Sequence, residues 1–328
     1  MLFCTCEYYS IRIQEWSVCV IHHPYGVFNN RAKDYEHIKV LPLAAAMGAE
    51  ICGVSIADLS DEAFEEMCDA LYRHKMIYLR GQGISHAEQE AFTARFGPFA
   101  MDAYTEGVEG YEHVQPVIRL ADDPVAIIFG SGWHFDSPFL PDPPSITILR
   151  GVDIPPFGGD TMWANAALAY SVLSDTMKSM LHTLEVRMSI QNFMLEIQKV
   201  KMIAGTDGLK TSVHESPDPE MARQKIVGTA HPIVRTHPIT GEKALFCDRT
   251  YTSNIEGMHP DEAEPILKFL AGHLIQPAFT CRLRWQPDTI AIWDNRLCAH
   301  QAFNDHDGYR REMYRTIVAH ERGLSGSG

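Results

Sequence analysis

Short apolar runs, separated by proline and glycine, follow one another through much of the chain after residue 112. Runs of this length with such punctuation are typical of β-strands. The pattern predicts strands at about 114–120, 125–129, 145–150, 160–163, 233–236, 243–246, 279–285, 289–293 and 313–320. A further run at 76–79 predicts a short buried strand near the start of the core.

Four segments carry helix signals instead. The first starts at Ser60, with acidic residues in its first turn and basic residues in its last, an order that the helix dipole favours. The second starts at Ser85, which has capping-box spacing to Glu88. The predicted helices are 60–75, 85–97, 165–183 and 261–274.

Many short strands with a few helices outside them favour a mainly β protein with flanking helices, either a β-sandwich or a jelly roll. No internal repeat or second hydrophobic core is visible. We therefore expect a single domain at 38–322, an N-terminal extension at 1–37 and a flexible tail at 323–328. The irregular stretch at about 190–230, rich in Met, Lys and Gly, is expected to form a mobile lid.

The composition narrows the range of partners and compartments. A formal net charge of −14 without a long Lys/Arg run argues against nucleic acid, because an acidic protein repels phosphate backbones. No stretch approaches the roughly 18 apolar residues of a membrane span, and no secretory signal is visible. Eight cysteines without any Asn-x-Ser/Thr sequon favour free thiols in a reducing cytoplasm.

Two histidines and one aspartate form a candidate metal site. Side chains at i and i+2 of a strand share a face, so His134 and Asp136 would project together. His300 could supply a third ligand from another strand. Two imidazoles and one carboxylate are the ligand set of non-haem Fe(II) oxygenases, and the open positions suit a 2-oxo acid and O2. With 16 histidines in the chain, the alternative is that His134 is an ordinary core or loop residue.

Two arginines follow shortly after His300. On a strand, Arg311 and Arg315 would lie on the same inward face as apolar neighbours. Buried guanidinium groups are costly unless an anion meets them, and their planar fork matches a carboxylate. They could therefore clamp an acidic co-substrate. The alternative is an internal ion pair, with Asp294 or Asp305 as the partner.

These residues lie in segments that resemble a known family. WHFDSPF, GGDTMWAN and WDNRLCAHQAFNDHDGYRREMYRTIV are similar to the Fe(II)- and 2-oxoglutarate-dependent taurine and 2,4-dichlorophenoxyacetate dioxygenase family. The upstream segment MGAEICGVSIADLSDEAFEEMCDALYRHKMIYLRGQGIS resembles the family's N-terminal block. The resemblance runs from about residue 38 to 320, with the blocks in order.

The resemblance implies a double-stranded β-helix, also called a jelly roll, with helices outside. It implies Fe(II) on His134, Asp136 and His300, and 2-oxoglutarate with its distal carboxylate on Arg311 and Thr161. It also implies O2 as the oxidant, hydroxylation of a small organic substrate with release of succinate and CO2, and C–heteroatom cleavage when the hydroxylated carbon carries a heteroatom.

The substrate-binding residues of the taurine enzyme are not reproduced. Asp102 falls near the place where that enzyme offers a histidine to the sulfonate, and Gly130 near its asparagine. Asp102 could meet an amine or hydroxyl, or simply face solvent. Arg315 matches the family's second arginine, which lies near the co-substrate and the substrate's acidic group. Phe193, in the predicted lid, is a further candidate for substrate contact.

Other classes are less well supported. The main alternative is a non-catalytic β-sandwich that binds a metal and a small acid. Phe129-Gly130-Ser131-Gly132 lacks the spacing of a hydrolase nucleophile elbow, and no dinucleotide-binding glycine motif follows a strand. Trp163 and Trp293 could line the pocket or belong to the core. By analogy with the family, a homo-oligomer, dimer or tetramer, is expected.

Overall fold

Two β-sheets of unequal size face each other across a shared apolar core. The computed structural model describes residues 26–101, 105–123, 130–195 and 219–321. Its strands are β1 (Lys39–Pro42), β2 (Ala49–Cys52), β3 (Met76–Leu79), β4 (Gln115–Arg119), β5 (Ile146–Asp153), β6 (Thr161–Asn165), β7 (Glu185–Met188), β8 (Thr229–Pro232), β9 (Val234–Thr236), β10 (Lys243–Leu245), β11 (Thr252–Ile255), β12 (Thr280–Leu283), β13 (Ile290–Asp294), β14 (Cys298–Ala302) and β15 (Arg311–Val318).

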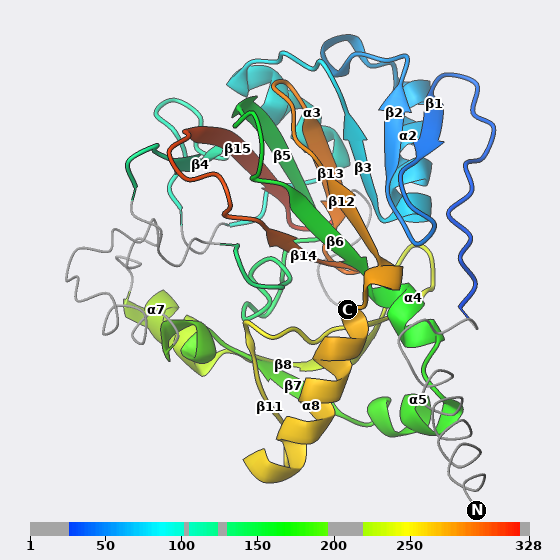
Figure 1. The fold of residues 1–328 in the computed structure, drawn as a ribbon, viewed down its shortest axis with the longest axis vertical. Coiled ribbons are helices and arrows are strands. Elements are labelled where there is room, and N and C mark those ends of the chain that lie inside the picture. Colours follow the sequence, from blue (N-terminus) through cyan, green and yellow to red (C-terminus); the bar gives the residue numbers. More distant parts are fainter. Residues whose placement is uncertain (1–25, 102–104, 124–129, 196–218, 322–328) are drawn as a thin grey trace, which may run out of the picture.

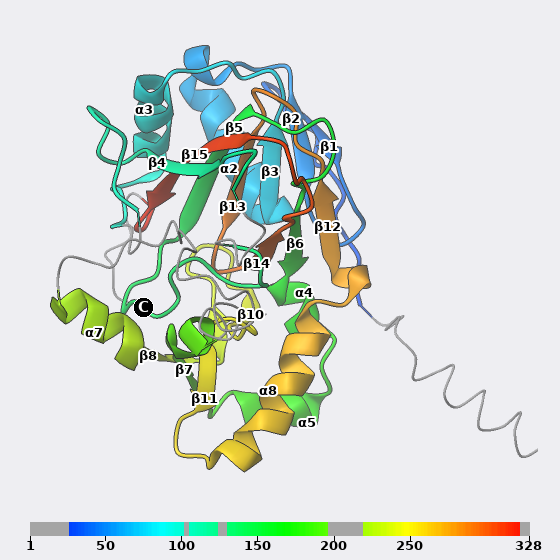
Figure 2. The same cartoon turned by 60° about the vertical axis from the view of Figure 1, so that its left-hand side comes forward.

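The helices lie mostly on the outside of these sheets (Figure 1). They are α2 (Asp61–His74), α3 (His86–Phe96), α4 (Ala166–Ser171), α5 (Asp175–Leu181), α7 (Pro219–Val227) and α8 (Pro260–Leu274), with 3-10 turns at Ile56–Asp58 and Pro277–Phe279. In both views α8 runs beside β7, β8 and β11, away from α2 and α3 (Figures 1 and 2).

The larger sheet has seven strands in the order β1-β2-β3-β13-β5-β15-β4, and the facing sheet has three in the order β12-β6-β14. Neighbouring strands are antiparallel except β2 and β3. Two smaller sheets, β11-β7-β8 and β10-β9, complete the described part of the fold. The chain is therefore mainly β with flanking helices, as predicted.

Alternation along the strands of the large sheet sends successive side chains to two different cores. On β13, Ile290 and Ile292 pack outward with α2 and α3, while Ala291 and Trp293 point toward the facing sheet. The ring of Trp293 lies 5.6 Å from the ring of Trp163 on β6, centroid to centroid. The inner core therefore fills the space between the two sheets.

Capping residues fix where the outer helices begin. Ser60 accepts a hydrogen bond from the Ala63 amide at the start of α2. Ser85 and Glu88 form the predicted capping box of α3. Both helices thus satisfy backbone donors that would otherwise be orphaned at their N-termini.

One predicted helix is wrong in extent. Instead of a single helix at 165–183, α4 ends at Ser171 and α5 starts at Asp175. Ser174 takes extended backbone angles and caps α5 by accepting from the Met177 amide, which breaks the helix. The prediction also missed β1, β2, β7, β8, β11 and β14, which are short and mixed in polarity.

Several predictions concern residues outside the described ranges. These are the strand at 125–129, residues 1–25 of the N-terminal extension, the tail at 323–328, and 196–218 of the expected lid. At the lid's ends the structure contains a helical turn at 191–195 and the helix α7. The lid therefore stays a prediction. In the described residues no helix is long and apolar enough to cross a bilayer.

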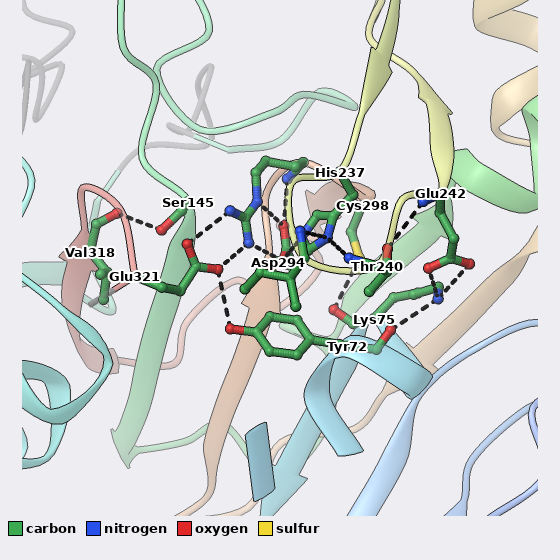
Figure 3. Close-up of polar contacts among 12 residues, drawn as sticks. Tyr72, Lys75, Ser145, His237, Thr240, Glu242, Asp294, Cys298, Val318 and Glu321 are labelled. Carbon is green, nitrogen blue, oxygen red and sulfur yellow. Dashed lines mark hydrogen bonds and ion pairs between the residues drawn. The ribbon is translucent and has the colours of Figure 1, made fainter. Parts of the chain in front are cut away.

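A buried charge network holds the turn between β13 and β14 (Figure 3). The Arg296 guanidinium donates to both carboxylate oxygens of Asp294 and to the Glu321 carboxylate near the end of the described chain. His237 donates from Nε2 to Asp294, because its Nδ1 accepts from the Thr240 amide. Burial disfavours the Asp294 charge, but Arg296 outweighs it and holds the Asp294 pKa well below its usual value.

Replacing Arg296 by alanine tests the weight of this network. Arg296→Ala leaves two buried carboxylates without their cation, so the free energy of unfolding should fall by about 3–5 kcal/mol. Urea denaturation measures it. Lys33→Ala is the control, because Lys33 and Asp69 form an exposed pair worth about 0–1 kcal/mol. Equal, small losses in both variants would contradict the role given to Arg296.

Candidate active site

His134, Asp136 and His300 meet at one point between the two sheets. His300 lies on β14, and His134 pairs with it through two backbone hydrogen bonds of 2.9 and 2.8 Å. Asp136 Oδ1 lies 3.9 Å from His134 Nε2 and 3.7 Å from His300 Nε2. Atoms that ligate one cation through bonds of about 2.1 Å lie roughly 3–4 Å apart, so this geometry fits a metal centre.

The strand expected for His134 and Asp136 is largely absent. Only His134 pairs with another strand, through an isolated bridge, and the chain turns at Ser137, whose φ is 42°. The two side chains still converge because the turn follows directly after Asp136. The alternation argument was therefore right about the shared direction and wrong about the local structure.

The protonation states around this point suit a metal. Gly132 O lies 2.7 Å from His134 Nδ1 and can only accept, so Nδ1 donates there and Nε2 is the ring nitrogen that faces the site. Burial and the neighbouring His134 lower the pKa of His300 to about 3, so it is neutral. Burial opposes the Asp136 charge, but the positive charge of Arg315 and the hydrogen bond from Thr147 help to lower the Asp136 pKa overall. Neutral imidazoles and an ionised carboxylate are the forms that bind metal.

A second group of possible ligands, His237, Asp294 and Glu321, lies in the network of Figure 3. There Arg296 already donates to both carboxylates. The cation of that network is therefore a guanidinium, and we assign no metal to it.

The arginines of β15 face inward as predicted. Arg311, Met313 and Arg315 are buried and alternate with the less buried Glu312 and Tyr314, and from Arg315 to Val318 the strand is buried on both faces. Burial lowers the pKa of Arg311 to about 10. Its Nε and Nη2 have no hydrogen-bond partner in the described part of the chain. A buried, unsatisfied guanidinium calls for an anion from outside the protein.

The alternative of internal ion pairs fails for Arg311 and holds in part for Arg315. Asp294 is bound by Arg296, and Asp305 Oδ1 accepts from the Gly159 amide. Arg315 Nη1 lies 3.5 Å from Asp136 Oδ1, beside the candidate metal point. Arg315 therefore places a positive charge next to the ligand carboxylate.

One cavity of about 320 Å³ joins these groups. The three candidate ligands, Thr161, Arg311 and Arg315 all line it. Thr161 Oγ1 accepts from Trp285 Nε1 at 3.0 Å, which leaves its hydroxyl hydrogen for another acceptor. A more open depression of about 870 Å³ lies elsewhere, beside α4, and contains none of these residues.

The other candidates fall in different places. Trp293 lines the cavity, whereas Trp163 belongs to the core. Phe193 is not among the lining residues, and its ring contacts Tyr251, 6.2 Å away between centroids. Asp102 lies outside the described residues. Gly130 does line the cavity.

Sequence reasoning missed a third inward arginine. Arg119 on β4 stands opposite Arg311 in the strand register, and it also lines the cavity. Its Nη atoms contact Asn304, His306 and Asp307 in the loop before β15. Alternation along 114–120 gives the only sequence signal, since it puts Arg119 on the same face as Val117.

Comparison with known proteins agrees with this geometry. The model of the taurine catabolism dioxygenase TauD, TfdA family matches residues 39–317. An alpha-ketoglutarate-dependent sulfate ester dioxygenase of Pseudomonas putida is 32% identical over 87% of this chain and 90% of its own length. An (S)-phenoxypropionate/alpha-ketoglutarate-dioxygenase of Sphingobium herbicidovorans is 28% identical over 85% of this chain and 94% of its own length.

The structural comparison points the same way. The crystal structure of a taurine dioxygenase from Burkholderia xenovorans superposes with a TM-score of 0.71 and 31% identity, over 87% of this chain and 92% of that one. With the converging ligand set, the inward arginines and a family match over most of its length, the chain belongs to the TauD/TfdA family of Fe(II)- and 2-oxoglutarate-dependent dioxygenases.

Proposed function

We propose that the protein hydroxylates a small organic anion, with Fe(II) on His134, Asp136 and His300. The observation that carries the assignment is Arg311, a buried guanidinium with two nitrogens that find no partner among the described residues, in the cavity that the three candidate ligands line. The distal carboxylate of 2-oxoglutarate supplies the anion that Arg311 lacks, with the Thr161 hydroxyl as a second donor.

The donor set supports iron as the metal. Two imidazole nitrogens and one carboxylate oxygen match the facial triad of non-haem Fe(II) oxygenases. When bound, Fe(II) supplies the redox chemistry by which O2 and 2-oxoglutarate yield succinate and CO2 while the substrate gains a hydroxyl group. The protein orients 2-oxoglutarate and the substrate through its arginines, and it encloses the site between the two sheets.

The charge around the cavity supports an anionic substrate. Three arginines line it: Arg119 pairs with the exposed carboxylate of Asp307, Arg315 lies 3.5 Å from Asp136, and Arg311 has no carboxylate partner among the described residues. The two curated relatives described above act on sulfate esters and phenoxypropionate, which are both anions. In such compounds a heteroatom adjoins the carbon to be hydroxylated, so hydroxylation leads to C–heteroatom cleavage. Arg315, beside Asp136, is the proposed partner of the substrate's acidic group.

We make three further assignments, which concern the fold, the compartment and the assembly. We propose that the two facing sheets form a double-stranded β-helix, as their alternating inner faces and shared core suggest. We also propose a cytoplasmic enzyme, in keeping with the free cysteines of the described residues. Assembly as a dimer or tetramer stays a prediction by analogy.

Asp136→Ala should abolish succinate release, because the only carboxylate ligand is lost. Succinate formed from 2-oxoglutarate in the presence of sulfate esters, sulfonates, phenoxy acids and amines provides the assay. Asp142→Ala, at an exposed position nearby, is the control and should keep the parent rate. Undiminished turnover by Asp136→Ala would refute the metal assignment. A parent protein that binds 2-oxoglutarate without ever releasing succinate would favour the binding-only alternative.

Arg311→Ala should weaken 2-oxoglutarate binding by about 10- to 150-fold, the equivalent of about 1.5–3 kcal/mol for a hydrogen bond to a charged group. The KM for 2-oxoglutarate is the readout. The control is Arg310→Ala, because the Arg310 side chain is exposed and lies directly before β15. If both variants keep the parent KM, the carboxylate binds elsewhere.

Arg315→Ala should act on the substrate rather than on the co-substrate. We expect a higher KM for an anionic substrate, or 2-oxoglutarate consumption that exceeds product formation. Measuring succinate and hydroxylated product in the same reaction separates the two effects. A variant with parent values for both would show that Arg315 is only structural.

A further inference from the structure

A chain of three hydrogen bonds leads from the core to the candidate ligand Asp136. Trp293 Nε1 donates to Asn295 Oδ1 at 2.9 Å, and Asn295 Nδ2 donates to Thr147 Oγ1 at 2.8 Å. Thr147 Oγ1 then donates to Asp136 Oδ2 at 2.6 Å. All four side chains are buried, with Thr147 at 0% exposure.

The direction of this chain follows from its chemistry. An indole nitrogen can only donate, so the carbonyl end of the Asn295 amide must face Trp293. The amide's NH2 group then faces Thr147 and occupies a lone pair of its hydroxyl oxygen. The single hydroxyl hydrogen of Thr147 is left for the Asp136 carboxylate, which accepts only. Each group thus has one available role.

The backbone around the chain is held firmly. Thr147 on β5 stands opposite Trp293 on β13 in the strand register. The backbone N–H of Asn295 donates to Ser145 O. Asp294 and Arg296, the neighbours of Asn295, belong to the buried network of Figure 3. The turn that carries Asn295 is therefore anchored on its other side by the charges of Asp294, Arg296 and Glu321.

The two oxygens of Asp136 consequently have different surroundings. Oδ2 takes the Thr147 hydrogen, while Oδ1 faces His134 and His300. The same chain begins at Trp293, whose ring packs 4.8 Å from the His300 ring, centroid to centroid. A hydrogen-bonded carboxylate cannot turn freely to offer both oxygens to one cation.

We propose that Thr147 and Asn295 are positioning residues that hold Asp136 as a one-oxygen metal ligand. This inference rests on the proposed function. If Oδ2 also bound the metal, it would occupy one of the three positions needed by the two oxygens of 2-oxoglutarate and by O2. Partners that orient a ligand in this way typically contribute 10–100-fold to metal affinity.

A purely structural role makes a different prediction. Valine has nearly the shape of threonine, and a hydroxyl replaced by an apolar group of the same shape costs little when its partners can adjust. Thr316 offers a matched case, because it is also fully buried on the large sheet and its hydroxyl bonds Thr93 at 2.7 Å, on the outer face. The comparison of Thr147 with Thr316 separates positioning of the ligand from general packing.

The test is an anaerobic titration of the full-length apoprotein with Co(II), followed by its visible absorption spectrum. Thr147→Val should weaken Co(II) binding by about 10–100-fold and alter the spectrum. Thr147→Ser, which restores the hydroxyl, should recover the parent affinity and spectrum. Asn295→Ala should weaken binding by less than Thr147→Val, because the Thr147 hydroxyl is still present. Thr316→Val should bind Co(II) like the parent.

Thermal unfolding of each variant checks that it is folded. If Thr147→Val does not fold, the test compares the Co(II) affinities of the two single variants Thr147→Ser and Asn295→Ala. Parent-like affinity and spectrum in both Thr147→Val and Asn295→Ala would overturn the proposal, as would equal weakening by Thr316→Val. If the parent itself does not bind Co(II), the metal assignment and hence the proposed function fail. If the parent binds and the Thr147 variants bind equally well, only the positioning role fails.

Discussion

The pair of backbone hydrogen bonds between His134 and His300 is the contact on which the rest of the site depends. It joins a loop in the first half of the chain to β14 near its end, and so brings two imidazoles from distant parts of the sequence to one point. Asp136 follows two residues later, where the chain turns. Without this short pairing, the two histidines and the aspartate would not converge on one point.

The inner faces of the two sheets concentrate polar groups where an apolar core would otherwise form. Arg311, Arg315 and Thr161 lie there, and Asp136 reaches the same cavity from a loop. Such groups lower stability unless each finds a partner. Asp136 finds Thr147 and Arg315, whereas Arg311 keeps two nitrogens for a ligand. In our proposal this unsatisfied group binds the carboxylate of 2-oxoglutarate, which is the pattern expected where function overrides stability.

The buried ion network on the other side of the β13–β14 turn complements this arrangement. Arg296 pairs with Asp294 and Glu321, and none of these three is among the described residues that line the cavity. Charged groups thus occur on both sides of the turn. Those of the buried network are paired with each other, whereas Arg311 in the cavity is available to a ligand. Rigidity supplied by the paired side keeps the strand of His300 and the amide of Asn295 in place.

Strand alternation and specific motifs made much of this predictable from the sequence. The period of two placed Arg311 and Arg315 inward, and the motif blocks indicated the family and three candidate ligands that the fold brings together. Contacts between distant segments could not be predicted this way. Arg119 faces Arg311 only through the pairing of β4 with β15, and Thr147 reaches Asp136 only through the fold of β5. The break before Ser174 was missed because a single capping serine overrode an otherwise helical pattern.

The most direct test of the central claim is an anaerobic titration of the Fe(II)-loaded protein with 2-oxoglutarate, followed by visible absorption. Three ligands that hold one ferrous ion beside Arg311 predict a saturable new absorption band in the parent protein and none in a His300→Ala variant. A parent protein that develops no band, or a variant that develops the same band, would contradict the account.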